Sequence, residues 1–154
     1  MKSVLTKKGS EQTGVKQLYD WLERKLRAPQ RRLREPAQVT EEFRRHTGPR
    51  ILFGQLTLSA MPAAEFSYTS RISWPAPEQA QIFEDCVLEG ILDVLVIDQP
   101  NPVFGVAITL ERIAWHEVDS CALAYRMAAQ QAMRRIIAPE GWDSNCELVH
   151  SPAS

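Results

Sequence analysis

The residues most able to do chemistry are a histidine and two acids in the stretch WHEVDS at 115–120. A positioned histidine with a carboxylate at hand can act as a general acid or base. Asp119, however, directly precedes a run typical of a helix, where an Asp or Ser side chain caps the first turn and Glu117 suits the positive end. The remaining histidines, His46 and His150, lie far away in the sequence and have no carboxylates at metal-ligand spacing. This stretch therefore indicates neither an enzyme nor a metal site.

A second candidate motif, GSEQTGVK at 9–16, resembles a phosphate-binding loop. That motif requires an adjacent Gly-Lys pair followed by Ser or Thr. Here Val15 separates Gly14 from Lys16, and no strand precedes the motif. No serine-hydrolase, zinc-protease or paired-cysteine motif is present either. We therefore expect no nucleotide binding, no cofactor and no enzymatic activity.

Length and composition fit one globular domain with a tail. The chain has 154 residues, of which 44% are hydrophobic and 24% charged, and no apolar run approaches the roughly 20 residues that span a bilayer. We expect no signal peptide and no membrane partner. The three cysteines, Cys86, Cys121 and Cys146, form neither a disulfide framework nor a zinc pattern. A reducing cytoplasm is the simplest setting for them.

The charge of the chain is unevenly distributed. Residues 1–50 hold 13 Lys and Arg against 6 Asp and Glu, a net charge of +7. Residues 51–154 hold 5 against 13, a net charge of −8. A basic segment on an acidic body favours a polyanion partner or a self-neutralising contact, while a solvated arm that binds nothing is the third interpretation.

The N-terminal part of the chain predicts a helix followed by a linker. Apolar residues at spacings of three and four predict an amphipathic helix over 15–28, with its apolar side at Leu18, Trp21, Leu22 and Leu26. Pro29 ends this helix. The stretch PQRRLREP at 29–36 is interpreted as a basic linker.

The next segments predict strands. Residues 37–43 are expected to form a short edge strand, and the Gly-Pro pair within 46–50 predicts a turn. Alternating apolar residues predict strands at 51–60 and 66–74, which we expect to pair with each other in antiparallel fashion.

The remaining elements are two helices and a strand. Residues 77–96 predict a helix that faces the core with Ile82, Phe83, Cys86, Val87, Ile91, Val94 and Leu95. Residues 103–115 predict a strand, and 120–137 predict a helix capped by Asp119 or Ser120. The order β-β-β-α-β-α predicts the α+β class: a two-layer sandwich with a mixed sheet of about four strands and two helices on one face. The expected organisation is an N-terminal helix and basic linker (1–35), a domain (36–138) and a C-terminal tail without periodicity (139–154).

One stretch carries a specific pattern: PVFGVAITLERIAWHEVDSCALAYRMAA at 102–129. It resembles the fourth domain of translation elongation factor G, and the residues that match without a gap are Pro102, Val103, Ile108, Leu110, His116, Val118, Asp119, Ser120, Leu123, Ala124, Ala128 and Ala129. A second stretch, RRHTGPRILFGQL at 44–56, is similar to the basic loop that precedes a strand in that family, with Thr47, Gly48, Arg50, Phe53 and Gly54 at corresponding places. Two departures are Pro49 and Ile113, where the family tends to have glycines. The family's GTPase domain is missing from this chain.

This resemblance implies a tip that contacts RNA. In the family, the basic loop and the aromatic-histidine loop lie together beside tRNA and mRNA in the decoding site of the small ribosomal subunit. The residues implied by it are Arg44, Arg45, His46, Thr47, Gly48, Arg50, Trp115 and His116. His116 would contact RNA by stacking or hydrogen bonding, although it could also be an ordinary surface residue. Trp115 could stack on a base or pack into the core.

Two functions follow from the sequence as hypotheses. The first is a stand-alone module that binds the ribosome, tRNA or other RNA through its tip loops in a translation-related role in the cytoplasm. The second is a protein-interaction or orphan domain that kept the fold and lost RNA binding. The arginines of the tip and linker favour the first, and the acidic body favours the second. Fold alone does not decide between them.

Overall fold

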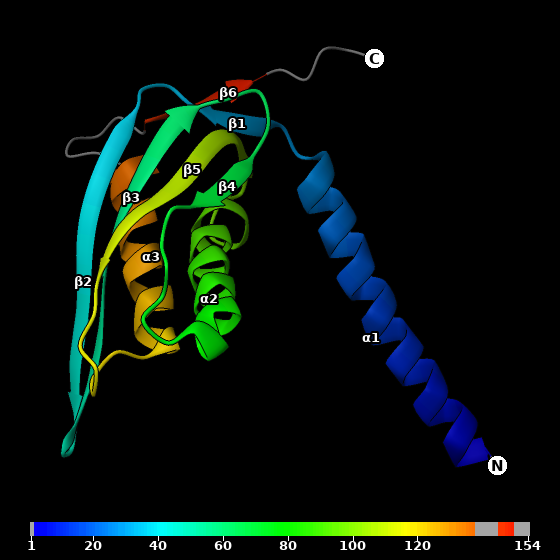
Figure 1. Cartoon of the computed structure of the whole chain (residues 1–154). Coiled ribbons are helices and arrows are strands. Elements are labelled where there is room, and N and C mark those ends of the chain that lie inside the picture. Colours follow the sequence, from blue (N-terminus) through cyan, green and yellow to red (C-terminus); the bar gives the residue numbers. More distant parts are fainter. Residues whose placement is uncertain (1, 138–144, 150–154) are drawn as a thin grey trace.

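The computed structural model describes residues 2–137 and 145–149, with side chains from residue 14 onward. Most of the expected tail at 139–154 lies outside the described residues. The elements in chain order are α1 Lys2–Arg27, β1 Gln30–Leu33, β2 Ala37–Thr47, β3 Arg50–Pro62, β4 Ser67–Ser70, a 3-10 turn Pro77–Gln79, α2 Ala80–Leu92, a π-helical turn Asp93–Ile97, β5 Val103–Ala114, α3 Ala122–Ile137 and β6 Cys146–Val149. A mixed sheet forms one layer, α2 and α3 cover one of its faces, and α1 extends away from the body (Figure 1).

The sheet has the order β2-β3-β5-β1-β6, with β4 also paired to β5. The pairs β2–β3, β3–β5 and β1–β6 are antiparallel, whereas β1 and β4 lie parallel to β5. From β2 to α3 the order is β-β-β-α-β-α, and both helices lie on one face (Figure 1). The predicted α+β sandwich is therefore confirmed.

Two strands lie where the sequence predicted none. The supposed linker at 29–36 contains β1, which pairs with β5 on one side and with β6 on the other. Both strands have only four residues, too few for alternation to stand out, and β1 carries Arg31 and Arg32. Gly105 gives Arg32 its room, because a Cβ atom there would lie 2.7 Å from the Arg32 Cβ. The sheet thus extends beyond the expected bounds of 36 and 138.

The predicted pairing of 66–74 with 51–60 is wrong. The strand in this segment is only Ser67–Ser70, and it pairs in parallel with β5. Helix α2 supplies the crossover that a parallel pair requires. The Glu84 carboxylate of α2 accepts hydrogen bonds from Tyr68 Oη at 2.6 Å, from Trp74 Nε1 at 2.8 Å and from the Ser70 hydroxyl. These bonds hold β4 and the segment after it against α2, where the Trp74 ring is buried.

The core lies between the sheet and the two helices. Its side chains include Leu56, Leu58, Ala60, Phe83, Val87, Ile91, Ile108, Leu110, Ala128, Ala129 and Ala132. The alanines let α3 approach closely, and Gly90 of α2 meets α3 so tightly that a Cβ atom there would lie 2.4 Å from the Arg126 carbonyl oxygen. One predicted core residue of α2 is wrong: Ile82 is 57% exposed. It sits at the border of the apolar stripe, on the side of the acidic Glu78 and Asp85.

Asp93, in the turn that follows α2, links this turn to α3 by hydrogen bonds. Its carboxylate accepts hydrogen bonds from Arg126 Nε at 2.9 Å and from Gln130 Nε2 at 2.8 Å. Burial alone would raise the pKa of Asp93, but these hydrogen bonds and the charge of Arg126 outweigh burial and lower the pKa below 3.8.

Asp93→Asn should therefore lower the free energy of unfolding at pH 7 by roughly 1 kcal/mol. A depressed pKa in the folded state stabilises the fold above the unfolded pKa, and this contribution is lost as the pH falls through the folded value. Urea unfolding at pH 7 and at a series of values below pH 3.8 checks this, since the difference between the variant and the native protein should shrink as the pH falls through the lowered pKa of Asp93. An equal difference at every pH would contradict the role of the charge.

Candidate nucleic-acid interface

Six of the eight predicted site residues lie at the end of the β2–β3 hairpin. The strands pair from Ala37↔Ala60 to Thr47↔Arg50, so that only Gly48 and Pro49 form the turn. Gly48 has a φ of 62°, the left-handed conformation that two-residue hairpin turns require and that glycine adopts without strain. Proline suits the following position because its φ is fixed near −65°. The hairpin tip is defined here as residues 44–50, and every residue in it is exposed.

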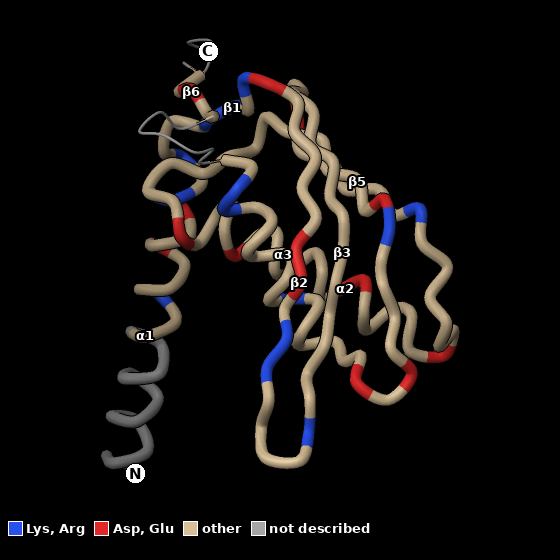
Figure 2. Tube along the Cα trace, turned by 90° about the vertical axis from the view of Figure 1, so that its left-hand side faces the viewer, with Lys and Arg blue, Asp and Glu red and all other residues tan. Residues whose placement is uncertain are grey.

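The cationic side chains of the hairpin tip divide between its two faces. Side chains alternate along a strand, and paired residues share a face. Arg44 is paired with Phe53 and His46 with Ile51, on the face of the sheet opposite α2 and α3. Arg45 is paired with Leu52, on the opposite face. Thr47 and Arg50 share that second face, so the tip presents arginine on both sides. Figure 2 shows the basic positions of both strands near the end of the hairpin.

The loop after β5 is fastened to β3 by backbone hydrogen bonds. Phe53 donates its N–H to the Asp119 carbonyl oxygen at 3.0 Å, and the Phe53 carbonyl oxygen accepts the N–H of Cys121 at 3.2 Å. Within the loop, the Ser120 hydroxyl accepts the His116 N–H at 2.8 Å, and Ser120 donates its own N–H to the His116 carbonyl oxygen at 2.9 Å. The sequence predicted that Asp119 or Ser120 caps α3; of these two, the Ser120 side chain instead closes the loop. His116 is held in a fixed position beside the hairpin.

His116 and Arg44 contact the same aromatic ring. The His116 and Phe53 ring centroids are 4.1 Å apart with an interplanar angle of 45°, and Arg44 Cζ lies 5.2 Å from the Phe53 centroid. The Phe53 side chain is only 1% exposed, although it lies on the face of the sheet opposite α2 and α3. The imidazole and the guanidinium are both exposed. An exposed cation and an exposed ring at one place can bind a phosphate and stack on a base.

Trp115, which directly precedes His116, packs against the core and is partly buried. Its ring is stacked on that of Tyr125 with centroids 6.2 Å apart, and it meets Phe83 edge-on at 5.2 Å. Tyr125 is fully buried and donates its hydroxyl to the Ala114 carbonyl oxygen at 2.6 Å. The sequence left open whether Trp115 stacks on a base or packs into the core. In the structure its ring packs against the aromatic side chains of the core.

Most of the predicted site residues divide into two groups: one contains Arg44, His46 and His116, and the other contains Arg45, Thr47 and Arg50 on the opposite face of the hairpin. Arg44 and His116 meet at Phe53, and His46 follows Arg44 by two positions on the same face. Arg50 lies three positions beyond Phe53 on its strand, about 10 Å further toward the turn. Acidic groups accompany both loops: Glu42 is 3.5 Å from Arg44 in a surface ion pair that contributes little, and the sequence adds Glu117 and Asp119 beside His116.

Sequence reasoning identified neither Phe53 nor Ser120 as a site residue. A signal for Phe53 was present, because alternation along 51–60 puts a large aromatic side chain on the polar face of the strand. Ser120 gave no such signal, since a serine before a helix usually serves as a cap.

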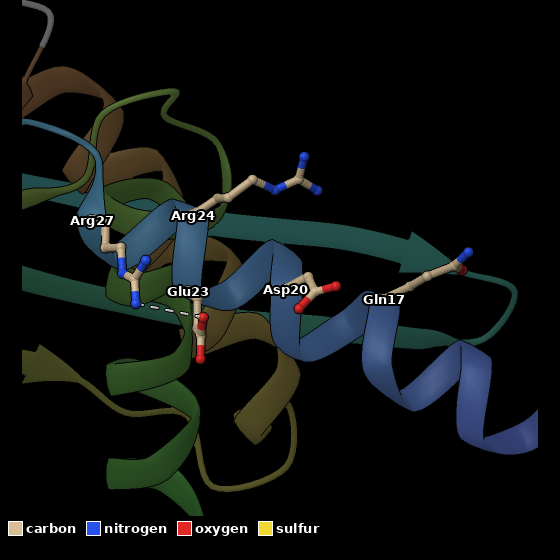
Figure 3. A pocket seen from close by; sticks show the side chains of 5 residues that line it. All are labelled: Gln17, Asp20, Glu23, Arg24 and Arg27. Atoms are coloured by element: carbon tan, nitrogen blue, oxygen red, sulfur yellow. Dashed lines mark ion pairs between the residues drawn. The ribbon is translucent and has the colours of Figure 1, made fainter.

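Other parts of the described chain offer weaker candidates. An open concavity on α1 is lined by Gln17, Asp20, Glu23, Arg24 and Arg27 (Figure 3). All five side chains come from one polar helix face, and Arg27 and Glu23 are 3.8 Å apart in an exposed ion pair. Within residues 2–137 and 145–149, no cluster of three or more His, Cys, Asp or Glu side chains could hold a metal ion. None of the described helices combines the length and the hydropathy that a bilayer crossing needs.

The comparisons with known proteins concern the fold. No protein-family model and no curated protein matches the sequence. Among 60 matching chains of solved structures is a crystal structure from Thermus thermophilus, with a TM-score of 0.63 and 24% sequence identity. The match covers 73% of this chain but 17% of the Thermus chain, so the present chain spans less than a fifth of that protein. At this identity the likeness shows a shared fold.

Proposed function

We propose that this chain is an RNA-binding module that resembles the fourth domain of elongation factor G and contacts ribosomal RNA, tRNA or other RNA through its hairpin tip and His116. The role is related to translation and lies in the cytoplasm. The chain hydrolyses no nucleotide and binds none by itself. The domain that carries this role comprises residues 36–138 together with β1 and β6, which complete its sheet.

The observation that carries the proposal is the shared contact of Arg44 and His116 with the Phe53 ring. The sequence resemblance joins these two segments, which lie 72 positions apart in the chain, and the backbone bonds between Phe53 and residues 119 and 121 hold them together. RNA is commonly recognised by arginine contacts to phosphate and by stacking of unpaired bases on exposed rings. Both groups are available here on one face, and further arginines extend to the turn.

A protein-interaction domain without RNA binding is the second candidate. Residues 51–154 carry a net charge of −8. This charge repels a polyanion from the parts of the surface outside the hairpin tip. Glu42 pairs with Arg44 and would have to release it to a phosphate. This second function predicts that changes in the hairpin tip leave any RNA affinity unaltered.

Single substitutions in the tip separate these functions. With a single-stranded RNA probe of decoding-site sequence, Arg44→Ala and Arg50→Ala should each weaken binding by about 1 kcal/mol. Each should reduce the slope of log affinity against log salt by about 0.7, the contribution of one phosphate contact. His116→Ala should weaken binding with little change of slope, because a neutral imidazole stacks or forms hydrogen bonds instead of pairing with phosphate.

Arg134→Ala is the matched control, since it removes one exposed arginine of α3 that is paired with Asp98. It should leave affinity and slope unchanged. If Arg134→Ala and Arg44→Ala have the same effect, binding depends on net charge alone, and the tip has no special role.

A further inference from the structure

Between residues 14 and 27, helix α1 carries an apolar stripe that is largely exposed. Four large side chains, Val15, Leu18, Tyr19 and Leu26, are each more than half exposed. At 3.6 residues per turn they lie within one face of the helix, together with the partly buried Leu22. A stripe of this kind on a helix normally packs against a partner.

The helix touches its own body at its C-terminal end. There Lys25 Nζ donates a hydrogen bond to the Gln99 carbonyl oxygen and lies 5.8 Å from the centroid of the Trp21 ring. From this point α1 diverges from α2 (Figure 1). The opposite face of α1 is polar and includes Gln17, Asp20 and Arg24 (Figure 3). The apolar stripe therefore lies on one side of α1, and among the described residues its large side chains are more than half exposed.

Charge indicates what covers this stripe. The α1 segment holds seven Lys and Arg and three Asp and Glu, a net charge of +4. Residues 77–97, which comprise α2 and its flanking turns, hold five Asp and Glu and no Lys or Arg, a net charge of −5. Arg126 of α3 offsets one of these charges through its ion pairs with Glu89 and Asp93. Three of these acids, Glu78, Asp85 and Glu89, are exposed, and Ile82 lies among them with 57% of its surface exposed. The outer face of α2 thus offers an apolar side chain surrounded by acids to a basic amphipathic helix.

We propose that the stripe is covered by a second copy of this chain, with α1 of each protomer lying along the outer face of α2 of its partner. Because α1 is held at Gln99 and points away from its own α2, the contact forms between copies rather than within one. Reciprocal exchange gives a two-fold dimer with two equal contacts. A helix of 26 residues is about 39 Å long, enough to follow α2 over its whole length. This inference is independent of RNA binding.

Two variants with the same change of charge test the stripe. Leu18→Glu places a carboxylate in the stripe, whereas Gln17→Glu places it on the polar face one residue away. Sedimentation equilibrium of the full chain at low salt should show a dimer for the native protein and for Gln17→Glu. Leu18→Glu should raise the dimer dissociation constant at least about tenfold, with an unchanged circular dichroism spectrum. High salt should weaken the native dimer by screening the opposite charges.

Substitution of Ile82 distinguishes the α1–α2 contact from pairing of two α1 helices. Ile82→Glu should weaken the dimer as Leu18→Glu does, although it lies on another element. An equal mixture of the two variants should recover dimer, because the mixed dimer retains one contact between a native α1 and a native α2. The proposal is wrong if the native protein is monomeric at all attainable concentrations, if Gln17→Glu and Leu18→Glu act equally, or if Ile82→Glu leaves the dimer intact.

Discussion

Gly54→Ala should lower the free energy of unfolding by about 3 kcal/mol, the upper end of the usual cost of overpacking. A Cβ atom at position 54 would lie 2.7 Å from the Ala124 carbonyl carbon and 2.7 Å from the Tyr125 nitrogen. Both are backbone atoms in the first turns of α3, so that no side chain can move to relieve the clash. Strand β3 and helix α3 would have to separate, although both belong to the core.

Urea unfolding followed by circular dichroism measures this effect, with Gly14→Ala as the control. Apart from the neighbouring backbone of α1 itself, no heavy atom lies within 4 Å of a Cβ at Gly14, so alanine there should be neutral or slightly stabilising, as its helix propensity favours. A Gly54→Ala protein as stable as the native one would mean that β3 and α3 are not packed as described.

Removing the three arginines of the hairpin tip should have the largest effect on RNA binding. Arg44, Arg45 and Arg50 are exposed and lie on both faces of the hairpin, so an RNA strand that passes the tip can use all three. At roughly 1 kcal/mol for each phosphate contact, the triple alanine variant should bind RNA about 100-fold more weakly. Fluorescence anisotropy with a labelled single-stranded RNA at constant salt measures the ratio.

The matched control replaces Arg71, Arg134 and Arg135 by alanine. These three residues carry the same charge but pair with Glu111, Asp98 and Glu41 on other elements. The control should keep most of the affinity. Equal losses in the two triple variants would favour a nonspecific effect of net charge and contradict a binding site at the tip.

Periodicity predicted the larger elements of this fold. The apolar stripe of 77–96 and the β-branched run of 103–115 are long enough for one period to dominate, and the structure has a helix and a strand there. The four-residue strands β1 and β6 could not be predicted from periodicity, because their conformation depends on their pairing with each other and on that of β1 with β5. Alternation in 66–74 indicated a face of the sheet but not the neighbouring strand, and the parallel pairing with β5 depends on the crossover through α2.

The sequence predicted the two loops of the candidate site, but neither the faces on which their side chains lie nor the role of Phe53. The Gly-Pro pair marked the hairpin turn, and the resemblance joined the tip to His116. The division of the arginines between two faces follows from the register of β2 with β3, which becomes definite only when the two-residue turn is known. The ring of Phe53 became part of the site because the loop at 116–121 folds onto β3, a contact between segments more than 60 residues apart. Local sequence carries no information about such a contact.

Co-sedimentation of the purified chain with ribosomes most directly tests its proposed role as an RNA-binding module. At low salt the native protein should pellet with ribosomes or with the small subunit, and should be released as salt rises, because phosphate contacts weaken with ionic strength. The Arg71, Arg134 and Arg135 control variant should pellet like the native protein, and the triple variant of the hairpin tip should stay in the supernatant. If the native protein does not pellet at any salt concentration, or if a folded tip variant pellets equally well, the RNA-binding account is contradicted and the protein-interaction domain takes its place.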